Sequence, residues 1–206
     1  METLLGVWCT ATSLAFIWPQ VWRTVRHDTT HGISSFATAH GMVSSCLWFS
    51  YGIGSGSVPM WFSNAQFIIA QSIIMSVLLR HGRIPPRVLA RFATVVVVLV
   101  AALLPLPLAA FGWTATVVST TSLMPQVAHV ARVENLHAIS LLSWAVTILS
   151  ATSWMIYGWV IDDPIMSVVN YFNIPMMVFI IVRAARWRTA NGVPLIGRTP
   201  PVPAGE

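Results

Sequence analysis

The chain contains an internal repeat. Its first apolar stretch ends in Pro19-Gln20, and the same dipeptide returns as Pro125-Gln126, an offset of 106 residues. The same offset, without gaps, also matches tryptophan, tyrosine and asparagine residues. Shared hydrophobicity does not explain matches of these residue types, so the sequence predicts two copies of one unit. Other identical pairs at this offset are Gly6 with Gly112, Ser13 with Ser119, Trp48 with Trp154, Tyr51 with Tyr157, Asn64 with Asn170 and Arg80 with Arg186.

The composition indicates a membrane protein. Hydrophobic residues make up 56% of the chain and charged residues only 8%, against roughly 25% charged residues in soluble domains. A spanning helix needs about 20 mostly apolar residues, and none of the apolar segments alternates as a barrel strand would. We therefore expect an all-α membrane protein. The seven predicted transmembrane helices are residues 4–23, 33–53, 59–80, 89–109, 112–131, 139–160 and 164–184.

The repeat divides these spans as 3+1+3. Spans one to three form the first unit and spans five to seven the second, while span four has no copy. Three helices leave the two ends of a unit on opposite sides of the membrane, so the extra span makes the two repeats parallel. The predicted divisions are a first triple-helix repeat at 1–82, a linker helix at 83–111, a second repeat at 112–188 and a disordered tail at 189–206.

Charge predicts the orientation. All eleven basic residues are arginines, and they flank the gaps at 23–32, 81–88 and 132–138 or the C-terminal tail. The opposite side holds Glu2, Asp162 and Asp163. The positive-inside rule places the N-terminus outside and the C-terminus in the cytoplasm, in the plasma membrane. This placement explains the basic charge by topology, so nucleic acid is not expected as a partner.

Pro19 and Pro125 are the predicted hinges. A proline inside a helix removes a backbone donor and bends the helix. A static bend that aids packing is the alternative, but each proline recurs with its glutamine. Gln20 and Gln126 are expected to bond the carbonyls that the bends free.

Two tryptophans and two asparagines are the predicted substrate-binding residues. Trp48 and Trp154 reach a depth comparable with that of Asn64 and Asn170, near the middle of the membrane. An aromatic face stacks on the apolar face of a sugar ring, and an amide offers a donor and acceptors to hydroxyls. The alternatives are interfacial anchoring for the tryptophans and helix-to-helix bonding for the asparagines.

Two tyrosines are the predicted outer gate. Tyr51 and Tyr157 lie one turn outward from the tryptophans, where they can close the path with Asp162 or Asp163. Ordinary interfacial tyrosines are the alternative. His40 lies inside span two, and its counterpart in the second repeat is not a histidine. We expect it to be either a protonation switch or a neutral, hydrogen-bonded residue.

The sequence gives no support to an enzyme. It has no phosphate loop, nucleophile elbow or HExxH helix, and its two cysteines lack metal-ligand spacing. We expect no catalytic residue, metal or cofactor. No Asp, Glu, Lys or Arg lies deep in a predicted span, although ion-coupled carriers usually need one. This absence favours a passive carrier.

The motifs resemble those of the PQ-loop superfamily, and within it the SWEET and SemiSWEET sugar transporters. The resemblance rests on the two Pro-Gln signatures, on Trp-x-x-Tyr-Gly at Trp48 and Trp154, and on the paired asparagines. His-x-Ile-Ser also follows each Pro-Gln, from His31 and His137. The resemblance implies facilitated, bidirectional diffusion of mono- or disaccharides by rocking of two triple-helix bundles, with Trp48, Trp154, Asn64 and Asn170 lining the sugar site.

The chain departs from the eukaryotic SWEET pattern, which also has prolines in spans two and six. Here only Pro19 and Pro125 match. Two other functions remain open: a proton-coupled amino-acid transporter, for which His40 is the available titratable group, and a receptor that binds a ligand without moving it. Two repeats enclose one path, so a monomer suffices, and a homo-oligomer remains open.

Overall fold

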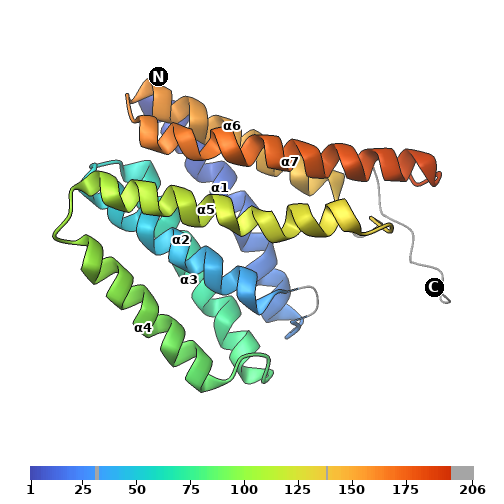
Figure 1. The fold of residues 1–206 in the computed structure, drawn as a ribbon, viewed down its shortest axis with the longest axis horizontal. Helices are drawn as coiled ribbons and strands as arrows, with labels where there is room; N and C mark the ends of the chain where they lie inside the picture. Colours follow the sequence, from blue (N-terminus) through green and yellow to red (C-terminus); the bar gives the residue numbers. More distant parts are fainter. Residues whose placement is uncertain (31–32, 138, 196–206) are drawn as a thin grey trace.

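The described part of the protein is a bundle of long helices. The computed structural model describes residues 1–30, 33–137 and 139–195, which contain seven helices and no strand. Five of them, α1, α3, α4, α6 and α7, are long and apolar enough to cross a membrane. The prediction of an all-α membrane protein is therefore confirmed. The helices in Figure 1 are α1 (Glu2–Arg26), α2 (Ser35–Gly54), α3 (Val58–Arg80), α4 (Pro86–Leu103), α5 (Leu108–Arg132), α6 (Leu141–Val160) and α7 (Pro164–Ala190).

Polar side chains of α2 and α5 bond to one another. The imidazole Nε2–H of His40 on α2 donates to the carbonyl of Val118 on α5, at 2.8 Å. The hydroxyls of Ser44 and Ser119 lie 2.7 Å apart across the same contact. Polar side chains inside a membrane are costly unless paired, and here the pairing joins the two repeats.

The linker helix is shorter than predicted. It ends at Leu103 rather than near residue 109, and α5 begins at Leu108 rather than at 112. Pro105 and Pro107 lie in the connection, and Pro107 is the residue that precedes the first turn of α5. Proline has no backbone N–H to donate inside a helix, but it suits the position just before or at the first turn.

The last helix is longer than predicted. α7 runs to Ala190 instead of ending near residue 184, and so it extends into the segment 189–206 that was predicted to be disordered. Most of that segment, residues 196–206, lies outside the described residues, as does His31 of the first His-x-Ile-Ser motif.

Six helices form a closed ring. In the first repeat α3 contacts both α1 and α2, and in the second α7 contacts both α5 and α6. Two further contacts, α1 with α6 and α2 with α5, join the repeats. The ring order is therefore α1, α3, α2, α5, α7, α6, and the linker α4 lies outside it, beside α2 (Figure 1). A site at the centre of this ring receives side chains from both repeats.

The two repeats share a core at one end only. We call the end that holds Met1 and the α6–α7 turn the N-terminal end, and the other the arginine-rich end. The N-terminal end has one core with residues from both repeats, whereas the arginine-rich end has one core in each repeat, and the bundles diverge there (Figure 1). The shared core is Cys9, Leu47, Tyr51, Met60, Leu103, Phe111, Ala115, Tyr157 and Met166.

Candidate functional site

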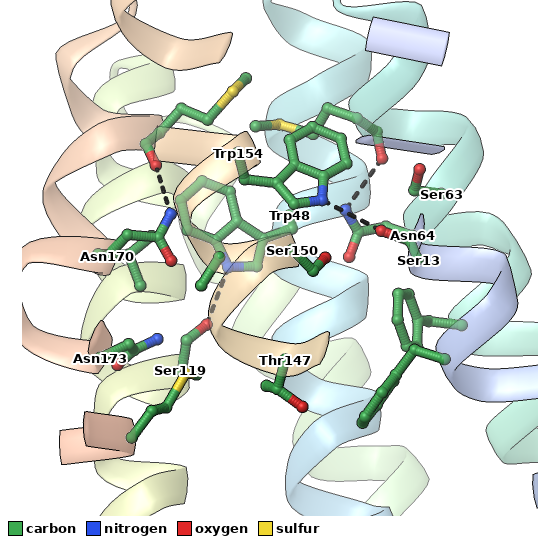
Figure 2. A pocket seen from close by; sticks show the side chains of 17 residues that line it. Ser13, Trp48, Ser63, Asn64, Ser119, Thr147, Ser150, Trp154, Asn170 and Asn173 are labelled. Atoms are coloured by element: carbon green, nitrogen blue, oxygen red, sulfur yellow. Dashed lines mark hydrogen bonds between the residues drawn. The ribbon is translucent and has the colours of Figure 1, made fainter. Parts of the chain in front are cut away.

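A cavity of about 290 Å³ lies between the repeats. All six ring helices line it, and all four predicted binding residues are among its walls (Figure 2). The polar lining residues are Ser13, Ser63, Asn64, Ser119, Thr147, Ser150, Asn170 and Asn173, and the aromatic ones are Phe16, Trp48, Phe67 and Trp154. The ring brings to one place residues that lie 106 positions apart in the chain.

Each tryptophan is held by the other repeat. The indole Nε1–H of Trp48 on α2 donates to Ser119 Oγ on α5, at 2.8 Å, and that of Trp154 on α6 donates to Ser13 Oγ on α1, at 3.1 Å (Figure 2). Ser13 and Ser119 correspond in the repeat, so the two bonds are a matched pair. Because each N–H already has a partner, the tryptophans offer the cavity mainly their aromatic surface.

Each asparagine is held by its own helix. Asn64 Nδ2 donates to the carbonyl of Met60 at 2.9 Å, and Asn170 Nδ2 donates to that of Met166 at 3.5 Å. These bonds leave each Oδ1 without a protein partner among the described residues. A carboxamide oxygen accepts hydrogen bonds, so the cavity presents two fixed acceptors, one from each repeat.

The cavity wall is neutral. Neither an acidic nor a basic side chain of the described residues lines it. A charged solute would need a paired charge at this depth, whereas hydroxyl-bearing neutral solutes are matched by serines, threonine and amides. The arrangement therefore suits a small polar molecule without net charge.

At the N-terminal end a tyrosine of the first repeat is paired with an aspartate of the second. The hydroxyl of Tyr51 lies 2.9 and 3.0 Å from the carboxylate oxygens of Asp163, to which it donates. The same carboxylate accepts from the backbone N–H of Met166 and so caps α7. Capping turns Asp163 toward the helix bundle, while Asp162 adopts a left-handed φ of 55° and is exposed. The structure thus pairs Tyr51 with Asp163 and not with Asp162.

Tyr51 and Tyr157 pack on glycines of the opposite repeat. A Cβ at Gly112 would lie 2.9 Å from the Tyr51 ring, and one at Gly6 would lie 3.3 Å from the Tyr157 ring. The two tyrosines therefore make equivalent packing contacts. Their hydroxyls differ, because the position that corresponds to Asp163 is Ser57 and the Tyr157 hydroxyl has no partner among the described residues.

The predicted hinge prolines lie inside helices that continue past them. Pro19 is within α1 and Pro125 within α5. The amides of Gln20 and Gln126 make no hydrogen bond in the described parts of the chain, so the expected bonds to freed carbonyls are absent. His40 bonds Val118 and does not line the cavity.

Sequence reasoning assigned no role to several lining residues. Ser13 and Ser119 were visible as a repeat pair, and that recurrence was the signal for their matched roles. Asn173 and Thr147 had no such signal, because the repeat places Phe67 and Gly41 at their positions.

The fold is thus a ring of two triple-helix repeats around a cavity without charged side chains among the described residues. Two family models match the chain: the PQ loop repeat over residues 1–61, and the sugar efflux transporter for intercellular exchange over residues 107–183. The first match covers most of the first repeat and the second most of the second repeat, so the chain is similar to PQ-loop and SWEET-type proteins.

A solved structure has the same fold. The 3.7 Å structure of a eukaryotic SWEET transporter matches with a TM-score of 0.68 and 12% identity, covering 90% of this chain and 99% of that chain. At this identity the likeness concerns the fold alone. No curated protein matches the chain.

Proposed function

We propose that the protein is a facilitative, bidirectional transporter of monosaccharides that works by alternating access. The observation that carries the proposal is the neutral cavity between the repeats, with two asparagine oxygens left free and two tryptophans fixed by crossed hydrogen bonds. A pyranose offers hydroxyl donors to the amide oxygens and C–H faces to the indole rings.

The neutral wall supports a sugar over an amino acid. A zwitterion would bring an ammonium and a carboxylate into a space that lacks counter-charges, and each unpaired charge is costly away from water. His40, the group on which the proton-coupled alternative depends, bonds to α5 and does not line the cavity. These observations also support transport without proton coupling.

The volume supports a single sugar ring. A cavity of about 290 Å³ is near the lower limit of roughly 300 Å³ for small-molecule pockets. One hexose fits such a space, whereas a disaccharide has twice as many rings to accommodate. We therefore expect glucose-sized substrates to be preferred over sucrose.

The asymmetry between the two ends supports alternating access. The N-terminal end is closed by a shared core and by the Tyr51–Asp163 bond, while the arginine-rich end has separate cores. Under the positive-inside rule the arginine-rich end is cytoplasmic, so this conformation is open toward the cytoplasm. Bending at Pro19 and Pro125 would let the bundles rock to the opposite state.

The test is uptake of labelled glucose and sucrose into proteoliposomes without a gradient of protons or potential. We expect glucose to equilibrate faster than sucrose. The double variant Asn64→Ala/Asn170→Ala should abolish uptake, because it removes both free acceptors. Asn191→Ala is the matched control, since Asn191 ends α7 at an exposed position and should keep full flux.

Two outcomes would favour other functions. Absence of sugar flux in folded protein, together with amino-acid uptake under a pH gradient that His40→Gln abolishes, would indicate the proton-coupled alternative. Sugar binding without flux would indicate a receptor. Either result would overturn the proposal.

A further inference from the structure

The cavity departs from the repeat symmetry on its arginine-rich side. Asn64 and Asn170 correspond, but one turn further along the helices α3 has Phe67 where α7 has Asn173, and both line the cavity. Thr147 of α6 also lines it, and its counterpart is Gly41, which has no side chain to do so. The polar groups here therefore come from the second repeat.

The opposite wall is apolar. Phe16 of α1 and Phe67 of α3 line the same region from the first repeat. Ser122 occupies the position that corresponds to Phe16, and it does not reach the cavity. A solute bound at the level of the paired asparagines thus meets amide and hydroxyl on one side and two phenyl rings on the other.

Asn173 has unused hydrogen-bonding capacity. It is only 8% exposed, and its Oδ1 is shielded without a partner in the described structure. Figure 2 shows its amide nitrogen turned toward the cavity, beside Ser119 and below Asn170. A buried polar group without a partner destabilises the protein, and such groups in native structures call for a functional reason. The Nδ2–H groups that face the cavity also have no partner among the described residues, and the oxygen of a ligand hydroxyl can accept from them.

We propose that Asn173 is a specificity-determining residue that binds one hydroxyl of the sugar and fixes its orientation, with Phe67 as the apolar counter-wall. This inference rests on the proposed function and deepens it. The two repeats are not equivalent toward the substrate, although the paired tryptophans and asparagines are. The hydroxyl-rich edge of the ring faces α7, and the less polar edge faces α3.

The test is inhibition of labelled glucose uptake in proteoliposomes by a series of monodeoxyglucoses, each lacking one hydroxyl. Asn173→Leu keeps a similar side-chain shape and removes the amide. We expect this substitution to weaken glucose binding by about three- to tenfold, which is the effect of losing one neutral hydrogen bond. One deoxyglucose, which lacks the hydroxyl that Asn173 binds, should bind wild type and variant equally.

Phe67→Leu is the matched control at the corresponding position of α3. It removes apolar surface without removing a hydrogen bond, so it should weaken the binding of glucose and of every analogue by the same factor. Thermal unfolding in detergent gives a second readout. Asn173→Leu should unfold at an unchanged or higher temperature, because it removes an unpartnered buried amide, and glucose should raise that temperature less than in wild type.

The outcomes are distinguishable. Suppose that the wild type transports glucose, but Asn173→Leu weakens the binding of every analogue equally or weakens the binding of none. The inference is then wrong, while the proposed function stands. If wild type neither transports nor binds any sugar, both fail. Asn173→Ala serves in the same experiment if the leucine variant does not fold.

Discussion

Removing the hydroxyl of Tyr51 should open the N-terminal end. In this conformation Tyr51 donates to both carboxylate oxygens of Asp163, across the contact between α2 and the start of α7. Tyr51→Phe deletes that bond and keeps the ring packed on Gly112. The bond joins the two repeats, so the rocking movement proposed above would break it.

The magnitude follows from the charge on the acceptor. A hydrogen bond to a charged group contributes about 1.5–3 kcal/mol, more than a neutral one. Tyr51 is buried, but Asp163 is partly exposed, so we take the lower figure of about 1.5 kcal/mol. This corresponds to about a tenfold fall in the ratio of closed to open protein, since about 1.4 kcal/mol is a factor of ten.

The assay is a spin-label distance across the N-terminal end. Val58 and Pro164 are the first residues of α3 and α7, correspond in the repeat and are exposed. Labels at these two positions, in a background of Cys9→Ala and Cys46→Ala, report the separation of the repeats by pulsed electron resonance. The Tyr51→Phe variant should populate the longer distance about tenfold more than the parent does.

Tyr157→Phe is the matched control. Tyr157 packs on Gly6 as Tyr51 packs on Gly112, but its hydroxyl has no partner among the described residues. The distance distribution should therefore stay that of the parent. If both tyrosine variants shift the distribution equally, or neither does, the Tyr51–Asp163 bond does not close this end and the reasoning is refuted.

Two further predictions concern packing and stability. Gly112→Ala would place a Cβ 2.6 Å from Ile165 Cγ2 and 2.9 Å from the Tyr51 ring, so it should lengthen the same spin-label distance, and an unchanged distance would contradict the close packing. Arg188→Leu should lower the free energy of unfolding by about 3 kcal/mol, measured by thermal unfolding in detergent, because Arg188 is 3% exposed and donates to the carbonyls of Ile139 and Pro194. The exposed Arg186→Gln should change stability little, and an equal effect of both would refute a structural role for Arg188.

The sequence predicted the helices well, and it predicted that the four repeated residues would lie close together, because both depend on features that recur. Seven apolar segments give seven helices, and the repeat brings Trp48, Trp154, Asn64 and Asn170 to one cavity. Helix ends were predicted less accurately. The connection at Pro105 and Pro107 shortened α4, and the arginines after residue 184 did not stop α7.

The sequence could not predict which aspartate accepts the hydrogen bond of the Tyr51 hydroxyl. Asp162 and Asp163 are adjacent and chemically identical, and only the turn before α7 decides which carboxylate faces Tyr51. Asn173 was missed for a related reason. Repeat matching finds residues that are the same in both halves, whereas Asn173 matters through its difference from Phe67.

The hydrogen bonds at the site are of two kinds, which respond differently to a movement of one repeat against the other. The Trp48–Ser119 and Trp154–Ser13 bonds cross between repeats, while the amides of Asn64 and Asn170 bond carbonyls of their own helices. A movement of one repeat against the other strains the crossed bonds but carries each asparagine along rigidly. In the proposed mechanism the asparagine oxygens therefore hold a sugar in both conformations, whereas the tryptophan bonds differ between the two conformations.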